Sequence, residues 1–405
     1  MSNFITRWFR RNAKGPERVE GEQYSTPATY AQTSAAPVTF DSAMTVSAFW
    51  ACVRLLTETV AALPLDAFRI SGNTKTKDLD YQLWRVINFM PNRYQTRVEY
   101  LETLMLNLTT DGNAYSAIQR GVNGSIVSLI PLMSAQMQVI LLDDGSITYE
   151  YTEANGNIRI YAEESIWHLK LFGNGIIGLS PLAYARQSLG IAIAIDNRVS
   201  TLAGNGGKTT GILTIDKMLT PEQRKQVKKK FEGLEAGNND GLFVLEAGFD
   251  YKQTSLSPAD MQMLESRRFQ VEDICRFMGV PSILVNDTSG TTAWGSGINQ
   301  IMDGFYKINL RPYLERFEAS WTRSLMPVTD WGNVVMEFNF DALLRADLKS
   351  RTEAAKSLVN SGLLTPNEGR QQEGLPPKPG GDDIYLNGTM VPAGTTGNTE
   401  GSNNG

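Results

Sequence analysis

Two stretches near the start of the chain carry apolar residues at helical spacing. Thr45 is a candidate N-cap for the first stretch, which ends at Pro64, and Thr96 is a candidate N-cap for the second, which ends at Gly112 and Asn113. The apolar faces consist of Phe49, Cys52, Val53, Leu56 and Val60, and of Tyr100, Leu101, Leu104 and Leu108. The spacing predicts two helices, and "LDAFRI" (65–70) between them is typical of a strand.

Between 113 and 171 the pattern changes to short stretches in which apolar and polar residues alternate. Turn sequences such as "GVNG", "DDGS" and "EANG" separate them. The stretches are "AYSAIQR", "SIVSLI", "QMQVILL", "SITYEYT", "NIRIYA" and "SIWHLKL". We expect a compact antiparallel β region here.

Two further helices flank a small mixed unit. Ser180 and Pro181 start the first helix, and their strong start signal outweighs the strand-like alternation of isoleucines at 191–195. Ser257 and Pro258 start the second, which ends at Gly279 and Pro281. Between them "GILTI" and "DGLFVLE" predict strands, and "TPEQRKQVKKKFEGL" (220–234) predicts a helix with a capping box.

The last third of the chain is mainly helical. Apolar spacing predicts a helix from about 298 to 325, and Pro312 within it should produce a kink because proline lacks the backbone N–H. The strand "VVMEFNF" follows, then helical stretches from about 341 to 359 and after Pro366. The composition of the final residues predicts a disordered tail.

Composition narrows the class of protein. The chain has 405 residues, 41% of them hydrophobic, a net charge of −5 and a pI near 5.3, which argues against a surface that grips nucleic acid tightly. Cys52 and Cys275 are expected to be buried, reduced thiols. The longest apolar run, "LGIAIAI", is far shorter than a bilayer requires, so we expect a soluble intracellular protein.

The first fourteen residues carry four positive charges interleaved with Trp8, Phe9 and other apolar residues. A membrane-surface or nucleic-acid-binding arm is one interpretation. The other is a frayed basic terminus, which the polar composition of the next thirty residues favours, with order beginning near Asp41.

Two glycine-rich segments imitate nucleotide sites. Gly207, Lys208 and Thr209 match the end of a P-loop, but Leu202 occupies the position of the first glycine, and the segment runs from helix to strand instead of strand to helix. In "DTSGTTAWGSGINQ" (287–300), Gln300 replaces the third glycine of a dinucleotide fingerprint. No cofactor is expected, although a helix N-terminus near 297 still permits a weak phosphate contact.

Catalytic chemistry finds no support in the remaining residues. His168 is the only histidine, so neither a metal site nor a histidine-based triad can be built easily, and its alternation predicts a place on the polar face of a strand. The chain is therefore expected not to be an enzyme. The helix at 220–234 carries a basic cluster that is either a solvated face or a docking surface for an acidic partner: Arg224, Lys225, Lys228, Lys229 and Lys230.

Several segments together resemble the portal proteins of tailed double-stranded DNA phages, of the lambdoid siphovirus type. They occur in family order over about 45–377: "SAFWACVRLLTETVAALPLDAFR", "DGNAYSAIQRGVNGSIVSLIPL", "GLSPLAYARQSLGIAIAI", "MLESRRFQVEDICRFMGVPSILV", "GFYKINLRPYLERFEASWTRSLM" and "FNFDALLRADLKSRTEAAKSLVNSGLLTPNEGRQQEGLPP". The combination is specific, although no single segment is a catalytic motif.

The resemblance implies an α+β portal fold. Its parts would be a disordered basic arm (1–40), the first part of a β-rich wing (41–179), a stem of two helices (180–204 and 257–280) around a small αβ clip (205–256), a tunnel-loop region (281–297), a long kinked helix with a wing strand (298–340), a helical crown (341–377) and a disordered tail (378–405).

The resemblance also implies a function. A ring of subunits, commonly twelve, would stand at one capsid vertex of the virion after assembly in the host cytoplasm, and double-stranded DNA would enter and leave through its channel without sequence-specific contacts. Expected partners are the terminase, the major capsid and scaffold proteins and a neck protein, with no membrane and no cofactor. Twelve subunits at −5 each would carry −60, so DNA would meet mild repulsion.

Carried over to single residues, the resemblance assigns three sites. The basic cluster of the clip helix would dock the motor and the neck protein, and Pro312 would mark the helix kink. The tunnel loop facing the DNA would consist of Thr288, Ser289, Gly290, Thr291, Thr292, Ala293, Trp294, Gly295 and Ser296. The alternative function is nucleotide binding through the Gly-Lys-Thr at 207–209.

Overall fold

The computed structural model describes residues 21–24, 36–72, 74–204, 212–215, 220–222, 225, 249–252, 258–286, 296–339, 348–372 and 375–384. The chain divides into two compact units, Met1–Phe338 and Asn339–Gly405. Each unit is treated by itself below.

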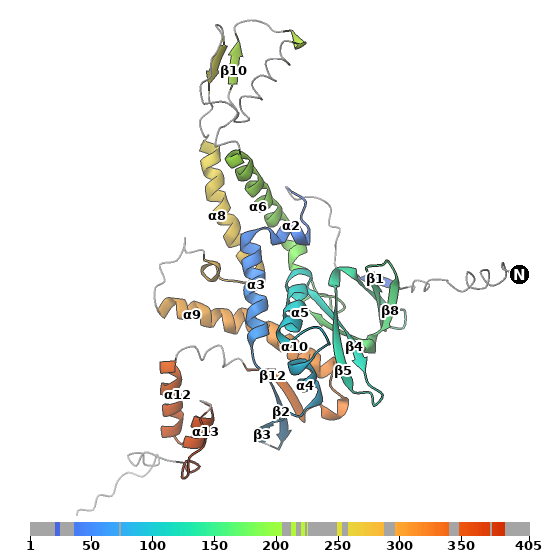
Figure 1. The fold of residues 1–405 in the computed structure, drawn as a ribbon, viewed down its shortest axis with the longest axis vertical. Helices are drawn as coiled ribbons and strands as arrows, with labels where there is room; N and C mark the ends of the chain where they lie inside the picture. Colours follow the sequence, from blue (N-terminus) through green and yellow to red (C-terminus); the bar gives the residue numbers. More distant parts are fainter. Residues whose placement is uncertain are drawn as a thin grey trace, which may run out of the picture. The chain divides into compact units, whose positions relative to one another are not determined.

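The helices of the first unit follow the predicted apolar spacing. Their bounds are α2 (Phe40–Met44), α3 (Ser47–Ala62), α4 (Gln82–Phe89), α5 (Arg97–Asp111), α6 (Pro181–Gly204), α8 (Pro258–Met278), α9 (Ser296–Gly304) and α10 (Arg311–Ser324), with a π-helical segment (Phe305–Leu310) between the last two (Figure 1). The start of α5 is as predicted: Thr96 and Glu99 form a capping box, and Gly112 ends the helix in the left-handed conformation.

The predicted cap at Thr45 is wrong. A capping box between Thr39 and Ser42 starts the additional short helix α2, and the Thr45 hydroxyl donates to the Ser42 carbonyl at 2.7 Å at the end of that helix. Helix α3 then begins after Val46, which provides no side-chain cap. The Thr45 hydroxyl, which the sequence pattern assigns to the start of α3, therefore bonds to the end of α2 instead.

The β region is antiparallel, as predicted, and forms separate sheets. One sheet has the order β1-β6-β7-β8 and another the order β5-β4-β9. The strands are β1 (Glu22–Tyr24), β4 (Asn113–Arg120), β5 (Ile126–Leu132), β6 (Met137–Leu141), β7 (Ile147–Thr152), β8 (Ile158–Ala162) and β9 (Ile166–Lys170). Strand β1 lies within residues 1–40, which we expected to be disordered. It is held there by antiparallel pairing with β6 over Glu22–Tyr24.

A third sheet has the order β12-β2-β3 and joins distant parts of the chain. Its strands are β2 (Leu65–Ser71), β3 (Thr74–Lys77) and β12 (Val334–Phe338). The polar sequence of β3 has no apolar alternation, so the sequence pattern does not reveal it; the ion pair between Lys75 and Glu337, at 2.7 Å, connects it to β12. Strands β10 (Ile212–Ile215) and β11 (Phe249–Lys252) form a two-stranded antiparallel pair.

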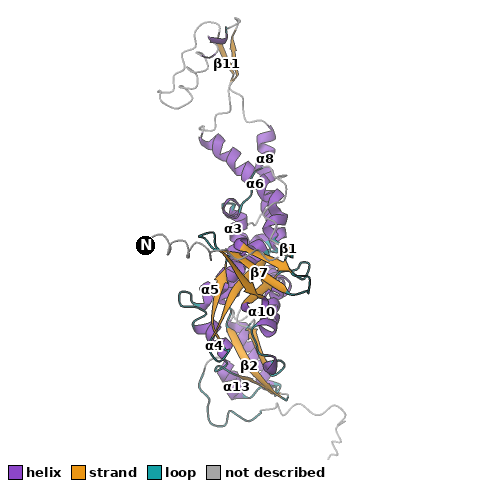
Figure 2. Ribbon diagram, turned by 90° about the vertical axis from the view of Figure 1, so that its right-hand side faces the viewer, coloured by secondary structure: helices purple, strands orange, loops and turns teal. Residues whose placement is uncertain are grey.

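The core lies between the sheets and the helices that cover them. Buried Tyr115, Val139 and Tyr149 belong to the apolar cluster shared by the β1-β6-β7-β8 and β5-β4-β9 sheets. On the opposite face of β4 and β9, the hydroxyls of Tyr100 (α5) and Ser116 lie 2.7 Å apart, and Trp167 donates to Ser320 (α10) at 3.1 Å. Helices α5 and α10 thus cover that face, and Figure 2 shows them beside the strands.

The second unit contains α12 (Leu348–Asn360) and α13 (Pro366–Gln372). Asn367 fastens the segment after α13: its side-chain amide donates to the Lys378 carbonyl at 2.9 Å and to Asp382 at 2.8 Å, and its oxygen accepts the Lys378 N–H at 2.8 Å. Neither this unit nor the described part of the first contains a helix with the length and apolar content needed to cross a membrane.

Candidate functional site

Helices α6 and α8 lie side by side and form what we call the stem pair (Figures 1 and 2). Helix α6 starts where predicted, because the Ser180 hydroxyl accepts the Ala183 N–H at 3.1 Å. The two helices are connected by polar contacts: Arg267 and Asp196 form an ion pair at 3.0 Å, and the Ser188 hydroxyl donates to Asp273. Such exposed contacts set the register of the helices but contribute little stability.

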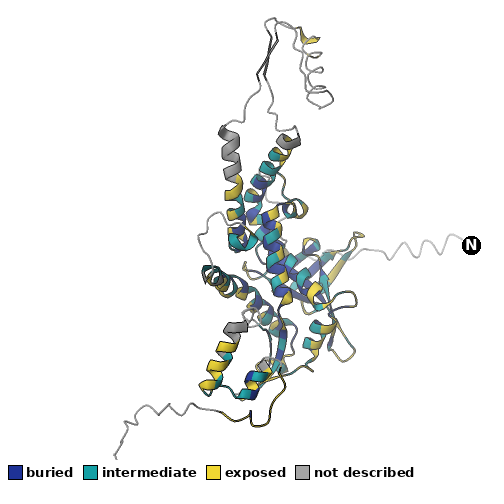
Figure 3. Ribbon diagram, turned by 60° about the vertical axis from the view of Figure 1, so that its left-hand side comes forward, coloured by how far each residue is buried: buried dark blue, intermediate teal, exposed yellow. Residues whose placement is uncertain are grey.

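Among the residues whose burial is described, the stem pair is buried where α6 meets α2 and α5 and where α8 meets α3. The buried apolar residues of α6 lie between Leu182 and Ala192, and those of α8 at Ile274, Cys275 and Met278 (Figure 3). Cys275 lies with its sulfur 3.7 Å from that of Cys52 in α3, and both thiols are buried and free, as the sequence predicts. The hydrogen bond between them, together with burial, raises the pKa of Cys52, so this thiol stays protonated.

Asn113 fixes the loop that leads into α6. Its oxygen accepts the Gly178 N–H at 2.7 Å, and its amide donates to the Gly178 carbonyl at 2.9 Å. Gly112 approaches the same loop so closely that an added Cβ would lie 2.0 Å from the Leu179 oxygen. Backbone contacts therefore form the junction between β4 and the loop that leads into α6, and they leave no room for a side chain at position 112.

The predicted placement of His168 on a polar strand face is wrong. The ring is only 8% exposed, because the face of β9 that carries it packs against β7 instead of meeting solvent. Burial lowers the pKa of His168 well below its ordinary value, so the ring is neutral. It donates from Nε2 to the Asn113 oxygen, which must accept because the amide nitrogen is already donating, and Nδ1 accepts from Tyr149 at 3.3 Å.

A helical run from Ser296 to Ser324 changes register in the middle. The π-helical segment precedes Pro312, which lies in the first turn of α10. The wider turn accommodates a residue that cannot donate a backbone hydrogen bond. Within this segment Asn309 packs on Gly279, where an added Cβ would lie 2.8 Å from its amide nitrogen, so the run is held against the end of α8.

Residues 47–374 match a protein-family model described as "Phage portal protein". The chain belongs to this family. The portal protein of Enterobacteria phage HK97 is 40% identical over 366 residues, which cover 89% of this chain and 86% of that protein. The probable portal protein of Streptomyces phage phiC31 is 30% identical over 356 residues, 85% of this chain and 78% of that protein.

Solved structures agree with this portal assignment. A chain from the virion of a native gene transfer agent particle aligns with a TM-score of 0.59 and 25% identity, covering 84% of this chain and 95% of that one. A crystal structure of an HK97-family phage portal protein from Corynebacterium diphtheriae aligns with a TM-score of 0.58 and 19% identity, covering 77% and 99%. The predicted family and the α+β portal fold are confirmed, and the chain is a virion protein.

Most residues assigned to the predicted portal sites lie outside the described part of the chain. This holds for 288–295 of the tunnel loop, for Arg224, Lys228, Lys229 and Lys230 of the clip, and for the Gly-Lys-Thr at 207–209. Ser296 is the first residue of α9, and Lys225 is helical and exposed. Pro312 lies in the helical run where the kink is predicted, and the kink itself stays a prediction.

Sequence reasoning missed the contacts that build the stem junction. The pairing of Cys52 with Cys275 and the role of Asn113 join residues far apart along the chain. The sequence does contain a signal for the role of Asn113, which is the Gly-Asn pair directly after α5. A polar residue at the start of an apolar strand needs buried hydrogen-bond partners. In the described residues no group of three His, Cys, Asp or Glu side chains is placed to hold a metal ion.

Proposed function

We propose that this portal protein assembles into a ring around a channel through which double-stranded DNA enters and leaves the capsid. The family match over 47–374 carries the proposal. The neck of the gene transfer agent particle, computed with twelvefold symmetry, aligns with 97% of its chain covered, so we take twelve as the subunit number. A ring of identical subunits uses head-to-tail contacts that close on themselves.

The exposed side chains of the stem pair support assembly. Tyr184 of α6 and Phe269 of α8 are 52% and 58% exposed in the single chain. Large apolar side chains on a long helix that buries few of its own residues are suited to contact with a neighbouring subunit. The stem pair would then line the channel, with α6 and α8 of every subunit around the axis.

The negative net charge supports passage of DNA instead of tight binding. Each subunit carries −5, and a channel that paired many phosphates with lysine or arginine would hold DNA by releasing its counterions. Weak repulsion leaves the duplex free to slide. The proposal assigns no catalytic step to this chain.

Docking of partners is proposed for the clip. The basic cluster Arg224, Lys225, Lys228, Lys229 and Lys230 supplies five positive charges within the segment 220–234, for which the sequence predicts a helix, and Lys225 is exposed. We propose that the terminase and later a neck protein bind there, and that capsid and scaffold proteins contact the wing. Reversing Lys228, Lys229 and Lys230 to glutamate is expected to abolish terminase binding to assembled rings, whereas unchanged binding would remove the clip from the proposal.

The tunnel loop offers a test of the channel. Replacing 288–295 by a short glycine linker is expected to leave ring assembly intact and to impair DNA packaging or retention, measured as DNA protected from nuclease in reconstituted capsids. Trp294→Ala tests the tryptophan itself: we expect a loss of packaging equal to that of the deletion, whether its side chain faces the DNA or packs the loop. Normal packaging by the deletion ring would contradict a role of the loop.

A further inference from the structure

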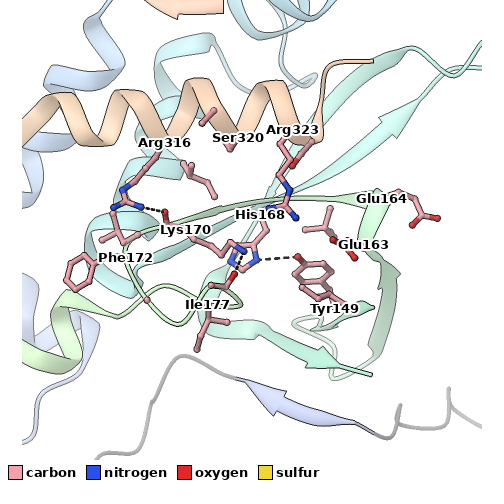
Figure 4. Close-up of a pocket in the computed structure, with 18 of the residues that line it drawn as sticks. Tyr149, Glu163, Glu164, His168, Lys170, Phe172, Ile177, Arg316, Ser320 and Arg323 are labelled. Atoms are coloured by element: carbon pink, nitrogen blue, oxygen red, sulfur yellow. Dashed lines mark hydrogen bonds between the residues drawn. The ribbon is translucent and has the colours of Figure 1, made fainter. Parts of the chain in front are cut away.

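A groove of about 810 Å³ lies along β9, between α10 and the loop that follows the strand. Figure 4 shows Arg316, Ser320 and Arg323 of α10 on one side of β9, and Tyr149 and Ile177 on the other. Nothing in the proposed DNA channel uses this groove, which lies in the part of the chain that we propose as the wing.

Strand β9 is the edge strand of its sheet, whose order is β5-β4-β9. The Leu171 N–H donates to the Gly112 carbonyl at 2.9 Å, directly after the strand. Because hydrogen-bonding direction alternates in an antiparallel ladder, Leu169 and Trp167 also direct their backbone groups at β4. The backbone N–H and C=O groups of Ile166, His168 and Lys170 therefore point away from β4. The Ile166 N–H already donates to the Glu163 carbonyl, which leaves the Ile166 C=O and the groups of His168 and Lys170 facing the groove.

One contact confirms this direction independently. Arg316, which reaches the groove from α10, donates to the Lys170 carbonyl at 3.4 Å. Within the described residues no strand pairs with the outer edge of β9. An unpaired edge in a groove is a template for an extended segment of another chain.

Four cations, Arg120, Lys170, Arg316 and Arg323, and two carboxylates, Glu163 and Glu164, line the groove, so its lining is cationic on balance. Arg316 lies beside Lys170 where β9 finishes, and Arg323 lies nearer the start of the strand, toward Glu163 (Figure 4). Lys170 donates to the Gly175 carbonyl at 2.7 Å. Among the described residues none of these three cations forms an ion pair with a carboxylate. Burial is the main cause that lowers the pKa of Lys170, the neighbouring Arg323 adds to it, and Glu163 opposes it. Phe172, 66% exposed at the rim, adds an apolar contact.

We propose that this groove binds an extended, acidic segment of a partner protein, which adds to β9 as a further strand and places carboxylates beside Lys170, Arg316 and Arg323. Backbone pairing would supply the affinity, and the three cations would supply the selectivity for acidic over basic segments. The proposal rests on the wing alone and does not require the DNA channel.

A second copy of this chain is a poorer occupant. Its edge strand β3 carries Lys75 and Lys77, and β8 carries Arg159, so both would bring positive charge to a cationic groove. On edge strand β12, Glu337 is already paired with Lys75. Edge strand β1 carries Glu22 but is only three residues long, and β5 carries no charge. Charge complementarity therefore favours a different, acidic protein.

The first experiment measures fluorescence anisotropy of a labelled nine-residue peptide in which glutamate alternates with valine, using full-length protein both unassembled and as rings. We expect saturable binding, at least about tenfold weaker for the same peptide with lysine in place of glutamate and for the double variant Arg316→Glu, Arg323→Glu. Arg85→Glu, an exposed arginine on α4, is the matched control and should bind like the unaltered protein. Thermal unfolding of each variant verifies that it is folded.

The second experiment tests strand pairing with the protein unaltered. One peptide is N-methylated at its even positions and another at its odd positions, so that each loses the hydrogen-bond donors of one edge. Strand addition predicts that one peptide binds like the parent and the other fails. Three results would overturn the proposal. They are equal binding by both methylated peptides, equal binding of the acidic and basic peptides, and no binding at millimolar peptide. Binding to the unassembled chain but not to rings would assign the groove to a neighbouring subunit and overturn it as well.

Discussion

Two groups of aromatic side chains lie in opposite environments, one in the part of the chain that we propose as the wing and one in the stem pair. In the wing, Trp167, Phe317, Trp321 and Phe338 form a buried cluster, which we call the wing core, with ring centroids 5.2 to 6.3 Å apart. In the stem pair, Tyr184 and Phe269 are about half exposed. The wing core completes its packing within one chain, whereas the proposed ring would cover Tyr184 and Phe269 with a neighbouring subunit.

The largest effect is expected at the junction of the two regions. Gly112→Ala places a Cβ 2.0 Å from the Leu179 carbonyl oxygen at a φ of +73°, and should lower the free energy of unfolding by at least about 4 kcal/mol. Gly124→Ala is the matched control, because its φ of +76° is similar but nothing lies within 4 Å, so only about 1 kcal/mol is expected. Urea unfolding followed by circular dichroism compares the two; equal losses would show that the close approach is unimportant.

The wing core should respond to truncation in the unassembled chain. Trp321→Ala removes a fully buried ring that packs on Phe317 and Phe338, and we expect a loss of about 3–5 kcal/mol in the free energy of unfolding. Thermal unfolding of monomer would measure it. A loss below about 1 kcal/mol would mean that the wing core does not hold the wing together.

The stem should behave in the reverse way. The double variant Tyr184→Ser, Phe269→Ser is expected to leave the free energy of unfolding of the monomer within about 0.5 kcal/mol, since both side chains are exposed. Ring assembly, followed by analytical ultracentrifugation over a concentration series, should weaken by about tenfold or more. If the monomer is destabilised and assembly is unaffected, the contrast between the two regions is wrong.

The wing also contains a titrating group. Glu318 of α10 accepts the Phe338 N–H at 2.9 Å, and burial is the main cause that raises its pKa to about 7. A carboxyl with a raised folded pKa stabilises the fold below its unfolded pKa, and this contribution is lost as the pH rises from about 4.5 through 7. Because Glu318 is partly exposed, we expect a loss on the order of 1 kcal/mol. Glu318→Gln should flatten the pH dependence of unfolding in this range, and an unchanged profile would exclude Glu318 as its source.

The smallest effect is expected for the ion pair between the stem helices. Arg267→Glu should cost less than about 1 kcal/mol, since both partners are substantially exposed. Adding Asp196→Arg reverses the pair and should restore the loss; a double variant worse than the single one would show that the contact is not an ion pair in solution.

Much of the fold follows from local pattern. Alternation between 113 and 171 predicts the strands there, and the capping signals of Thr96 and Ser180 place the starts of α5 and α6. The pattern did not predict helix α4 or strand β3, because the helix is short and the strand has no apolar alternation. The π-helical turn before Pro312 was missed since proline signals an interruption but not its geometry.

Contacts between distant segments could not be predicted from one sequence. Strand β1 pairs with β6 across more than a hundred residues, and Cys52 meets Cys275 across 223. The burial of His168 depends on which face of β9 the other sheet covers, and alternation alone cannot distinguish two faces. The cationic groove likewise arises only when α10 is placed beside β9.

Electron microscopy of the purified full-length protein, viewed down the particle axis, tests the central claim most directly. We expect a closed ring with a central channel, in which α6 and α8 of each subunit surround the axis and Tyr184 and Phe269 contact neighbouring subunits. Particles that remain single subunits under all conditions, including in the presence of scaffold and capsid proteins, would contradict the account.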